Sequence, residues 1–146
     1  MTYTIERITS PERLTELWPQ IAIALEPCVR KAMHGEMVLW DIHNLIAGGK
    51  AYCFVEMESG VVRVALVLEL VPFPRMSVAN VFALGGSGLM AARDRFWASI
   101  KSWLWLNGVK AVDAWVSDGM KRILERKLGF SEVYHHMRLE LNGETL

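Results

Sequence analysis

Apolar and polar residues recur along the chain in two different periods. In residues 61–71 every second side chain is apolar, and Arg63 and Glu69 share the less apolar face, which is typical of a central β-strand. In residues 91–107 the apolar positions instead recur at spacings of three and four, which predicts a helix with one face packed on a sheet. We therefore expect one sheet covered by helices.

Turn and capping residues predict where the elements begin and end. Ser10 followed by Pro11 is a helix start, and Pro19 and Pro27 are expected to bend or divide the helical region that follows. Gly60 closes a short turn between two strands, which predicts a hairpin. The predicted strands are residues 3–8, 51–57, 61–71, 76–84, 109–116 and 132–141, and the predicted helices are one from residue 11, then 29–46, 91–107 and 119–127.

The order of these elements is β-α-α-β-β-β-α-β-α-β. Strands joined by tight turns pair antiparallel, whereas a strand, helix and strand in succession form a parallel crossover. We predict an α+β fold of the α/β sandwich type, with a mixed, mostly antiparallel six-stranded sheet and helices on both faces. No linker rich in Pro, Gly or Ser interrupts the chain, so residues 1–146 are expected to form a single domain.

The composition argues against several classes of protein. The chain is 52% apolar, with six Trp and a mean hydropathy of +0.21, yet no apolar run reaches the ~18–20 residues that span a bilayer. Sixteen basic and sixteen acidic residues leave no net charge, so we expect no nucleic acid and no membrane as partner. The N-terminal residues do not have the pattern of a secretory signal, and Cys28 and Cys53 suit reduced thiols, so we expect a cytoplasmic protein.

A motif near the C-terminus is the most specific in the chain. Residues 118–130 align without a gap to the pattern Asn-x-x-Ala-x-x-Leu-Tyr-x-Lys-Leu-Gly-Phe, with Leu124 and the Lys-Leu-Gly-Phe tail in place. With the element order over nearly the whole chain, this motif resembles the GNAT superfamily of acetyl-CoA-dependent N-acetyltransferases. The resemblance implies transfer of an acetyl group from acetyl-CoA to a primary amine, on a small molecule or a protein, by direct attack.

The resemblance also implies where acetyl-CoA binds. The backbone of Phe82, Ala83 and Leu84 would pair with the pantetheine arm, because the fourth strand separates from the fifth in this superfamily. The family pattern Arg/Gln-x-x-Gly-x-Gly/Ala falls on residues 88–93, whose amides would hold the pyrophosphate at a helix start. These are Gly88, Leu89, Met90, Ala91, Ala92 and Arg93.

This phosphate-binding pattern departs from the family at three positions. Gly88 replaces the first Arg or Gln, Ala91 replaces the middle Gly, and Arg93 replaces the final small residue. Glycines at 85, 86 and 88 allow a displaced phosphate loop, in which Arg93 or Arg95 pairs with phosphate. The alternative is a flexible connection that binds no ligand, since a glycine cluster is a weak signal.

Two carboxylates are the candidates for proton transfer. Glu125 takes the place of the Tyr that protonates the departing thiolate in the family, although the cations around it favour a solvated, ionised helix residue. Glu69 is a candidate general base on a central strand, with Glu56 as a second choice. His135 and His136 point to opposite faces of a strand, with His135 expected in the core, and we predict no metal site.

A second hypothesis is a catalytically inactive GNAT-fold module that binds a protein or assembles with itself, for instance as a homodimer. The altered motif positions favour it, as does Trp105, which lies off the main apolar face of its helix. The Trp-Asp-Ile segment from Trp40 and the early glycines also resemble small phage-encoded GNAT-like proteins. That resemblance implies a role in virion assembly or host takeover.

Overall fold

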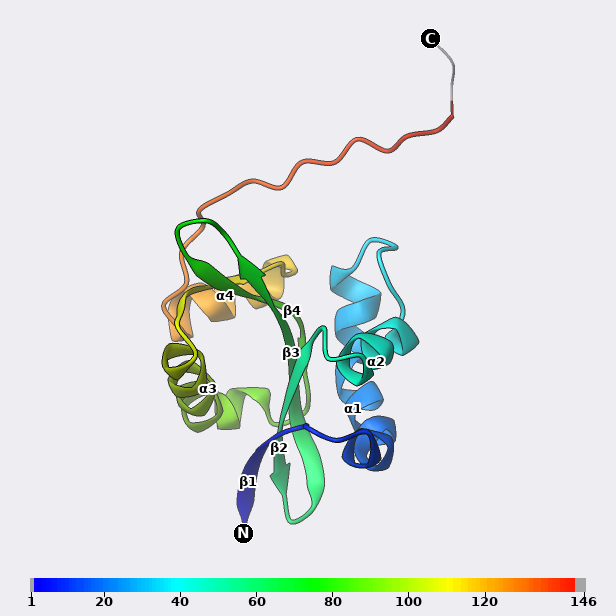
Figure 1. Ribbon diagram of the computed structural model, residues 1–146, viewed down its shortest axis with the longest axis vertical. Coiled ribbons are helices and arrows are strands. Elements are labelled where there is room, and N and C mark those ends of the chain that lie inside the picture. The colour runs from blue at the N-terminus through cyan, green and yellow to red at the C-terminus, as the bar shows by residue number, and fades with distance from the viewer. Residues whose placement is uncertain (1, 144–146) are drawn as a thin grey trace. The chain divides into compact units, whose positions relative to one another are not determined.

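The computed structural model describes residues 2–143 (Figure 1). They belong to two compact units, residues 1–116 and 117–146, and the prediction of a single domain stays a prediction. The larger unit contains β1 (Tyr3–Arg7), α1 (Pro11–Ala32), α2 (Leu39–Ala47), β2 (Tyr52–Glu58), β3 (Val61–Pro72), β4 (Ser77–Gly85), α3 (Leu89–Leu106) and β5 (Val109–Ala114). The smaller unit contains α4 (Asp118–Lys127).

The larger unit is built on a sheet with the strand order β1-β2-β3-β4-β5. The first four strands pair antiparallel in sequence order, and β5 returns through α3 to pair parallel with β4. Helices α1 and α2 cover one face of this sheet and α3 covers the other (Figure 1). The predicted α+β class, mixed sheet and helices on both faces are therefore confirmed in this unit.

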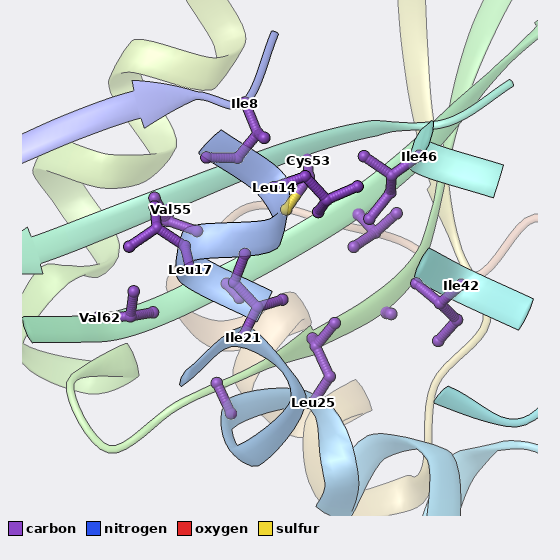
Figure 2. Packing of buried hydrophobic residues seen from close by; sticks show 14 of the residues in the cluster. Ile8, Leu14, Leu17, Ile21, Leu25, Ile42, Ile46, Cys53, Val55 and Val62 are labelled. Carbon is purple, nitrogen blue, oxygen red and sulfur yellow. The ribbon is translucent and has the colours of Figure 1, made fainter. Parts of the chain in front are cut away.

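The main core lies between the sheet and the helices α1 and α2 (Figure 2). A β-bulge at Arg63 determines which residues of β3 join this core. Glu56 pairs with Val64 and Met57 pairs with Val62, so Arg63 is an extra residue on β3. The extra residue brings Val62 onto the same face as Ala65 and Val67, although simple alternation along β3 would put it on the other face. The buried cluster comprises Ile8, Leu14, Leu17, Ile21, Ala24, Leu25, Ile42, Ile46, Ala51, Cys53, Val55, Met57, Val62, Ala65, Val67 and Ala83.

Helix α1 runs without interruption through both of its prolines, so they do not divide the helical region, and a bend at either one stays a prediction. A proline frees the carbonyl four residues before it, which here belongs to Thr15 for Pro19 and to Ile23 for Pro27. All four of these residues are exposed, so water can bind the freed carbonyls. The helical region instead divides at residues 33–38, between α1 and α2.

The predicted sixth strand, residues 132–141, is not formed. Within the described part of the chain, residues 129–143 belong to neither a helix nor a strand, and the sheet has five strands rather than six. His135, expected in the core, has an 83% exposed side chain that contacts Glu132 at 3.1 Å. Alternation indicates an extended backbone, but a strand also needs a neighbour for its N–H and C=O groups.

The Lys-Leu-Gly-Phe tail ends α4 in the smaller unit. Gly129 has a φ of +79°, and the Phe130 N–H donates to the Leu124 carbonyl at 3.1 Å, which is a glycine-capped helix end. The structural requirement for Gly explains why this part of the motif is intact. No helix of the described residues combines the length and apolar character that crossing a membrane requires.

Candidate functional site

Strands β4 and β5 separate before β4 ends. Their parallel pairing runs from Ser77 beside Val109 to Val81 beside Ala114, where β5 stops. Strand β4 continues to Gly85 and keeps β3 as its other neighbour. Residues 82–85 therefore have no strand partner on the β5 side within the described sheet, and that edge of the backbone is open.

A bulge at Phe82 coincides with this separation. Across the β3–β4 pair, Val67 lies opposite Ala83 and Leu68 lies opposite Val81, so Phe82 is an extra residue on β4. Such a bulge bends its strand and increases the local twist.

The thiol of Cys28 on α1 contacts the open edge of β4. Its sulfur lies 3.9 Å from the Phe82 carbonyl oxygen, to which it can donate. Burial raises the pKa of the Cys28 thiol, and a hydrogen bond from the Leu84 backbone lowers it in part. The Cys28 thiol thus contacts one backbone acceptor, on Phe82, and one backbone donor, on Leu84, and sulfur is a weak hydrogen-bonding partner for both.

The glycines at the end of β4 and in the loop after it pack against the protein's own backbone. A Cβ at Gly85 would collide with the Ala24 carbonyl oxygen of α1, and one at Gly86, whose φ is +134°, would collide with the Arg63 carbonyl oxygen. The Gly88 N–H donates to the same Arg63 oxygen at 3.0 Å. The glycine cluster therefore fixes the β4–α3 loop against α1 and β3, and the Gly88 amide is already used.

The N-terminus of α3 is a site with anion-binding character. This helix has 18 residues, no acidic residue in its first turn and no side-chain cap at its N-terminus in the described structure. The Ala92 N–H donates to the Gly88 carbonyl oxygen, so Leu89, Met90 and Ala91 carry first-turn N–H groups without an intrahelical acceptor. Those groups and the helix dipole favour a negatively charged ligand.

A polar pair lies beside the point where β4 and β5 separate. The Asn80 Nδ2 donates to Glu69 Oε1 at 3.2 Å, and the two residues face each other across β3 and β4. Asn80 is only 6% exposed, whereas Glu69 is half-buried. Asn80 was not among the predicted site residues, although an amide inside the apolar run Val78 to Leu84 is a signal for a buried polar site.

No protein-family model and no curated protein matches the sequence. Solved structures do match along nearly the whole chain. An aminoglycoside acetyltransferase from an uncultured soil metagenomic sample, in complex with sisomicin, has a TM-score of 0.69 at 12% identity over 96% of this chain and 97% of its own. A glucosamine-6-phosphate N-acetyltransferase from Arabidopsis thaliana has 0.66 at 13%, over 97% and 100%. A Staphylococcus aureus GNAT family acetyltransferase has 0.68 at 8%, over 97% and 100%. This chain has the GNAT fold.

The GNAT fold places the predicted coenzyme residues on consecutive elements. Phe82, Ala83 and Leu84 form the part of β4 beyond its last pair with β5, and residues 89–93 form the first turn and a half of α3. Arg93, expected to pair with phosphate in a displaced loop, donates from Nη1 to the Met90 carbonyl oxygen at 2.7 Å. These residues are continuous along the chain from the open strand edge to the open helix start.

The predicted catalytic carboxylates have different surroundings. Glu69 lies on β3 of the GNAT sheet, beside Asn80 and next to the strand separation. Glu125 is exposed on α4 in the smaller unit. Glu56, the second choice for a base, is fully buried and bound by Arg95. Among the described residues, no cluster of His, Cys, Asp and Glu has the arrangement of a metal site.

Proposed function

We propose that this protein transfers an acetyl group from acetyl-CoA to the primary amine of a small molecule. The observation that carries the proposal is the separation of β4 from β5 at the Phe82 bulge, which leaves an open strand edge inside a sheet. Two of the structures with this fold belong to acetyltransferases of aminoglycosides and of glucosamine-6-phosphate, both of which are amines.

The coenzyme would be held by backbone groups. An amide of the pantetheine arm would bind the Phe82 carbonyl and the Leu84 N–H, replacing the contact with the Cys28 thiol by stronger hydrogen bonds. The pyrophosphate would bind the first-turn N–H groups of Leu89, Met90 and Ala91. The Gly88 N–H would not take part in this binding, because it already donates to the Arg63 carbonyl oxygen.

The transfer requires a neutral amine next to the thioester. Glu69 would take a proton from the substrate ammonium, as a general base held in place by the Asn80 amide. The amine nitrogen would then attack the thioester carbonyl carbon, so that the C–N bond forms and the C–S bond breaks. The attacking nitrogen then loses its second proton to solvent, and the sulfur leaves as a thiolate. Because a free thiol has a pKa of about 8.5, solvent can return a proton to that thiolate without Glu125.

Calorimetric titration with acetyl-CoA and CoA tests the proposal. Saturable binding at micromolar concentration is expected, and no binding at millimolar concentration would end it. Alkylation of the thiols gives a second readout, because bound coenzyme would cover Cys28 and slow its reaction. Cys53 is the internal control, since it is 0% exposed and burial raises its pKa to about 12, so it should stay unreactive with and without CoA.

The second candidate is a non-catalytic GNAT-fold module, and one observation favours it. Trp105 on α3 is 68% exposed, with the Lys110 ammonium 4.9 Å from its ring. A large exposed indole suits an interface. Replacing Trp105 by Ser should then change the oligomeric state or the capture of a partner, and an unchanged result in both would count against this candidate.

A further inference from the structure

Three polar residues form a row across the end of the sheet. Asn80 on β4 lies beside Glu69 on β3 and beside Asp113 on β5 in the register of the two strand pairs. Side chains of register partners project to the same face of a sheet. That face carries α1 and α2, because Val67, two residues before Glu69 on the same strand, belongs to the core beneath those helices.

The amide of Asn80 has an unused acceptor. Its Nδ2 is the group that faces Glu69, because an ionised carboxylate accepts hydrogen bonds and cannot donate them. Its Oδ1 is buried and has no hydrogen-bond partner in the described structure. A buried acceptor without a partner costs about 1–3 kcal/mol, and a donor supplied by a ligand would remove that cost.

The row is also strongly acidic. Glu69 and Asp113 both have carboxylates, and no salt bridge within the described residues joins either of them to a cation. The row therefore offers oxygen acceptors and negative charge, with its one donor already directed at Glu69. Ammonium groups have the complementary chemistry, because they are positively charged and only donate.

Strand spacing indicates how many ammonium groups the row suits. Neighbouring strands lie about 4.8 Å apart, so the backbones of β3 and β5, with β4 between them, are separated by roughly 10 Å. Two carboxylates on such a span can each bind one ammonium of the same molecule. The row ends one residue before Val81 and Ala114, where β4 and β5 separate, so it lies beside the proposed thioester position.

We propose that Glu69, Asn80 and Asp113 bind an acceptor with two amines. Glu69 and the Asn80 Oδ1 take the reacting amine, and Asp113 holds the second ammonium. This inference rests on the proposed acetyl transfer and adds the class of acceptor, a diamine or a sugar with two amino groups. Asp113 then determines specificity, because it contacts the amine that does not react.

Binding of putrescine, butylamine and butanediol to the protein without acetyl-CoA tests the inference by calorimetry. Putrescine should bind more tightly than butylamine, and butanediol should not bind. Asp113→Asn should weaken putrescine binding about fivefold to tenfold and leave butylamine unchanged. Asp94→Asn is the matched control, because Asp94 is an exposed carboxylate on α3, and it should change neither affinity. Absence of putrescine binding, or equal losses in both variants, would overturn the proposal.

A second variant isolates the buried amide. Asn80→Leu keeps the side-chain volume and removes the unpartnered oxygen, so the protein should stay folded while both amines lose affinity. Unchanged butylamine binding in that variant would contradict the role of Asn80. Titration with acetyl-CoA distinguishes failure of the diamine site from failure of the proposed acetyl transfer. Coenzyme binding without putrescine binding overturns the diamine site alone, whereas putrescine binding without coenzyme binding overturns its role as an acceptor.

Discussion

Two carboxylates of the same sheet have opposite surroundings. Glu56 on β2 is 0% exposed and accepts two hydrogen bonds from Arg95 of α3, at 2.6 and 2.8 Å. The Arg95 guanidinium also lies 3.9 Å from the centre of the Tyr3 ring on β1. Glu69 on β3 is half-buried and accepts one hydrogen bond, at 3.2 Å, from the neutral Asn80 amide.

This difference separates a structural carboxylate from an available one. Bidentate binding by a guanidinium satisfies both oxygens of Glu56 and joins α3 to the sheet, so nothing is left to bind a substrate. Glu69 keeps a free oxygen and lies where β4 and β5 separate. A catalytic base needs that incomplete coordination, because it must accept a proton during the reaction.

The largest expected effect follows from removing the guanidinium. Arg95→Met leaves the Glu56 carboxylate buried and unpaired, which should lower the free energy of unfolding by about 3–5 kcal/mol. Urea unfolding measures this loss. Lys101→Met is the matched control, because Lys101 is exposed on the same helix and should change stability little. The double variant Glu56→Met with Arg95→Met should recover most of the loss, and failure to recover it would contradict a purely structural role.

The complementary change at Glu69 should affect activity instead. Glu69→Gln should lower kcat/KM for amine acetylation by about 10²–10⁴, because the general base is lost. The free energy of unfolding should change little, since the Asn80 amide can still donate to the remaining carbonyl oxygen. Activity equal to that of the unaltered protein would reject Glu69 as the base.

The sequence predicted the elements better than the contacts between them. The period of two in β3 and the spacing of three and four in α3 arise from local backbone geometry, so they identified both elements and their apolar faces. The local sequence pattern did not distinguish Glu56 from Glu69, because both are carboxylates on predicted strands. Arg95, 39 residues after Glu56, distinguishes them, and no local pattern contains such a distant contact.

The wrong prediction of a sixth strand has the same origin. Alternation in residues 132–141 predicted a strand, yet pairing depends on a neighbour that the segment itself does not specify. The phosphate loop at the glycines 85, 86 and 88 stays a prediction, and the structure shows that these glycines allow close contact with Ala24 and Arg63. A glycine cluster indicates that something approaches the backbone, but it does not indicate what.

The next prediction concerns the first turn of α3, the helix whose Arg95 binds Glu56. Met90 is exposed there, and Met90→Glu would place a negative charge beside the proposed pyrophosphate site. CoA affinity should fall about tenfold, or ~1.4 kcal/mol, in calorimetry. An acidic residue near a helix N-terminus stabilises the helix, so unfolding cannot explain the loss. Met90→Gln is the neutral control, and equal affinities in the two variants would exclude phosphate binding at this turn.

The smallest effect concerns a partly exposed counterpart of the Glu56 pair. Glu6 on β1 binds the Arg13 guanidinium of α1 at 2.8 Å, with both side chains about a third exposed. The hydrogen bond from Arg13 lowers the pKa of Glu6 below its ordinary value of 4.5. A lowered pKa in the folded state stabilises the protein above the unfolded pKa, and this contribution disappears as the pH falls through the folded pKa.

Glu6→Gln should therefore lower the free energy of unfolding by less than about 1 kcal/mol at neutral pH, because solvent screens an exposed pair. The difference between the variant and the unaltered protein should shrink as the pH falls below 4.5, where Glu6 becomes protonated. Urea unfolding at both pH values measures it, with the exposed Glu12→Gln as control. A loss as large as that of Arg95→Met would mean that exposure to solvent does not determine how much each of the two pairs stabilises the protein.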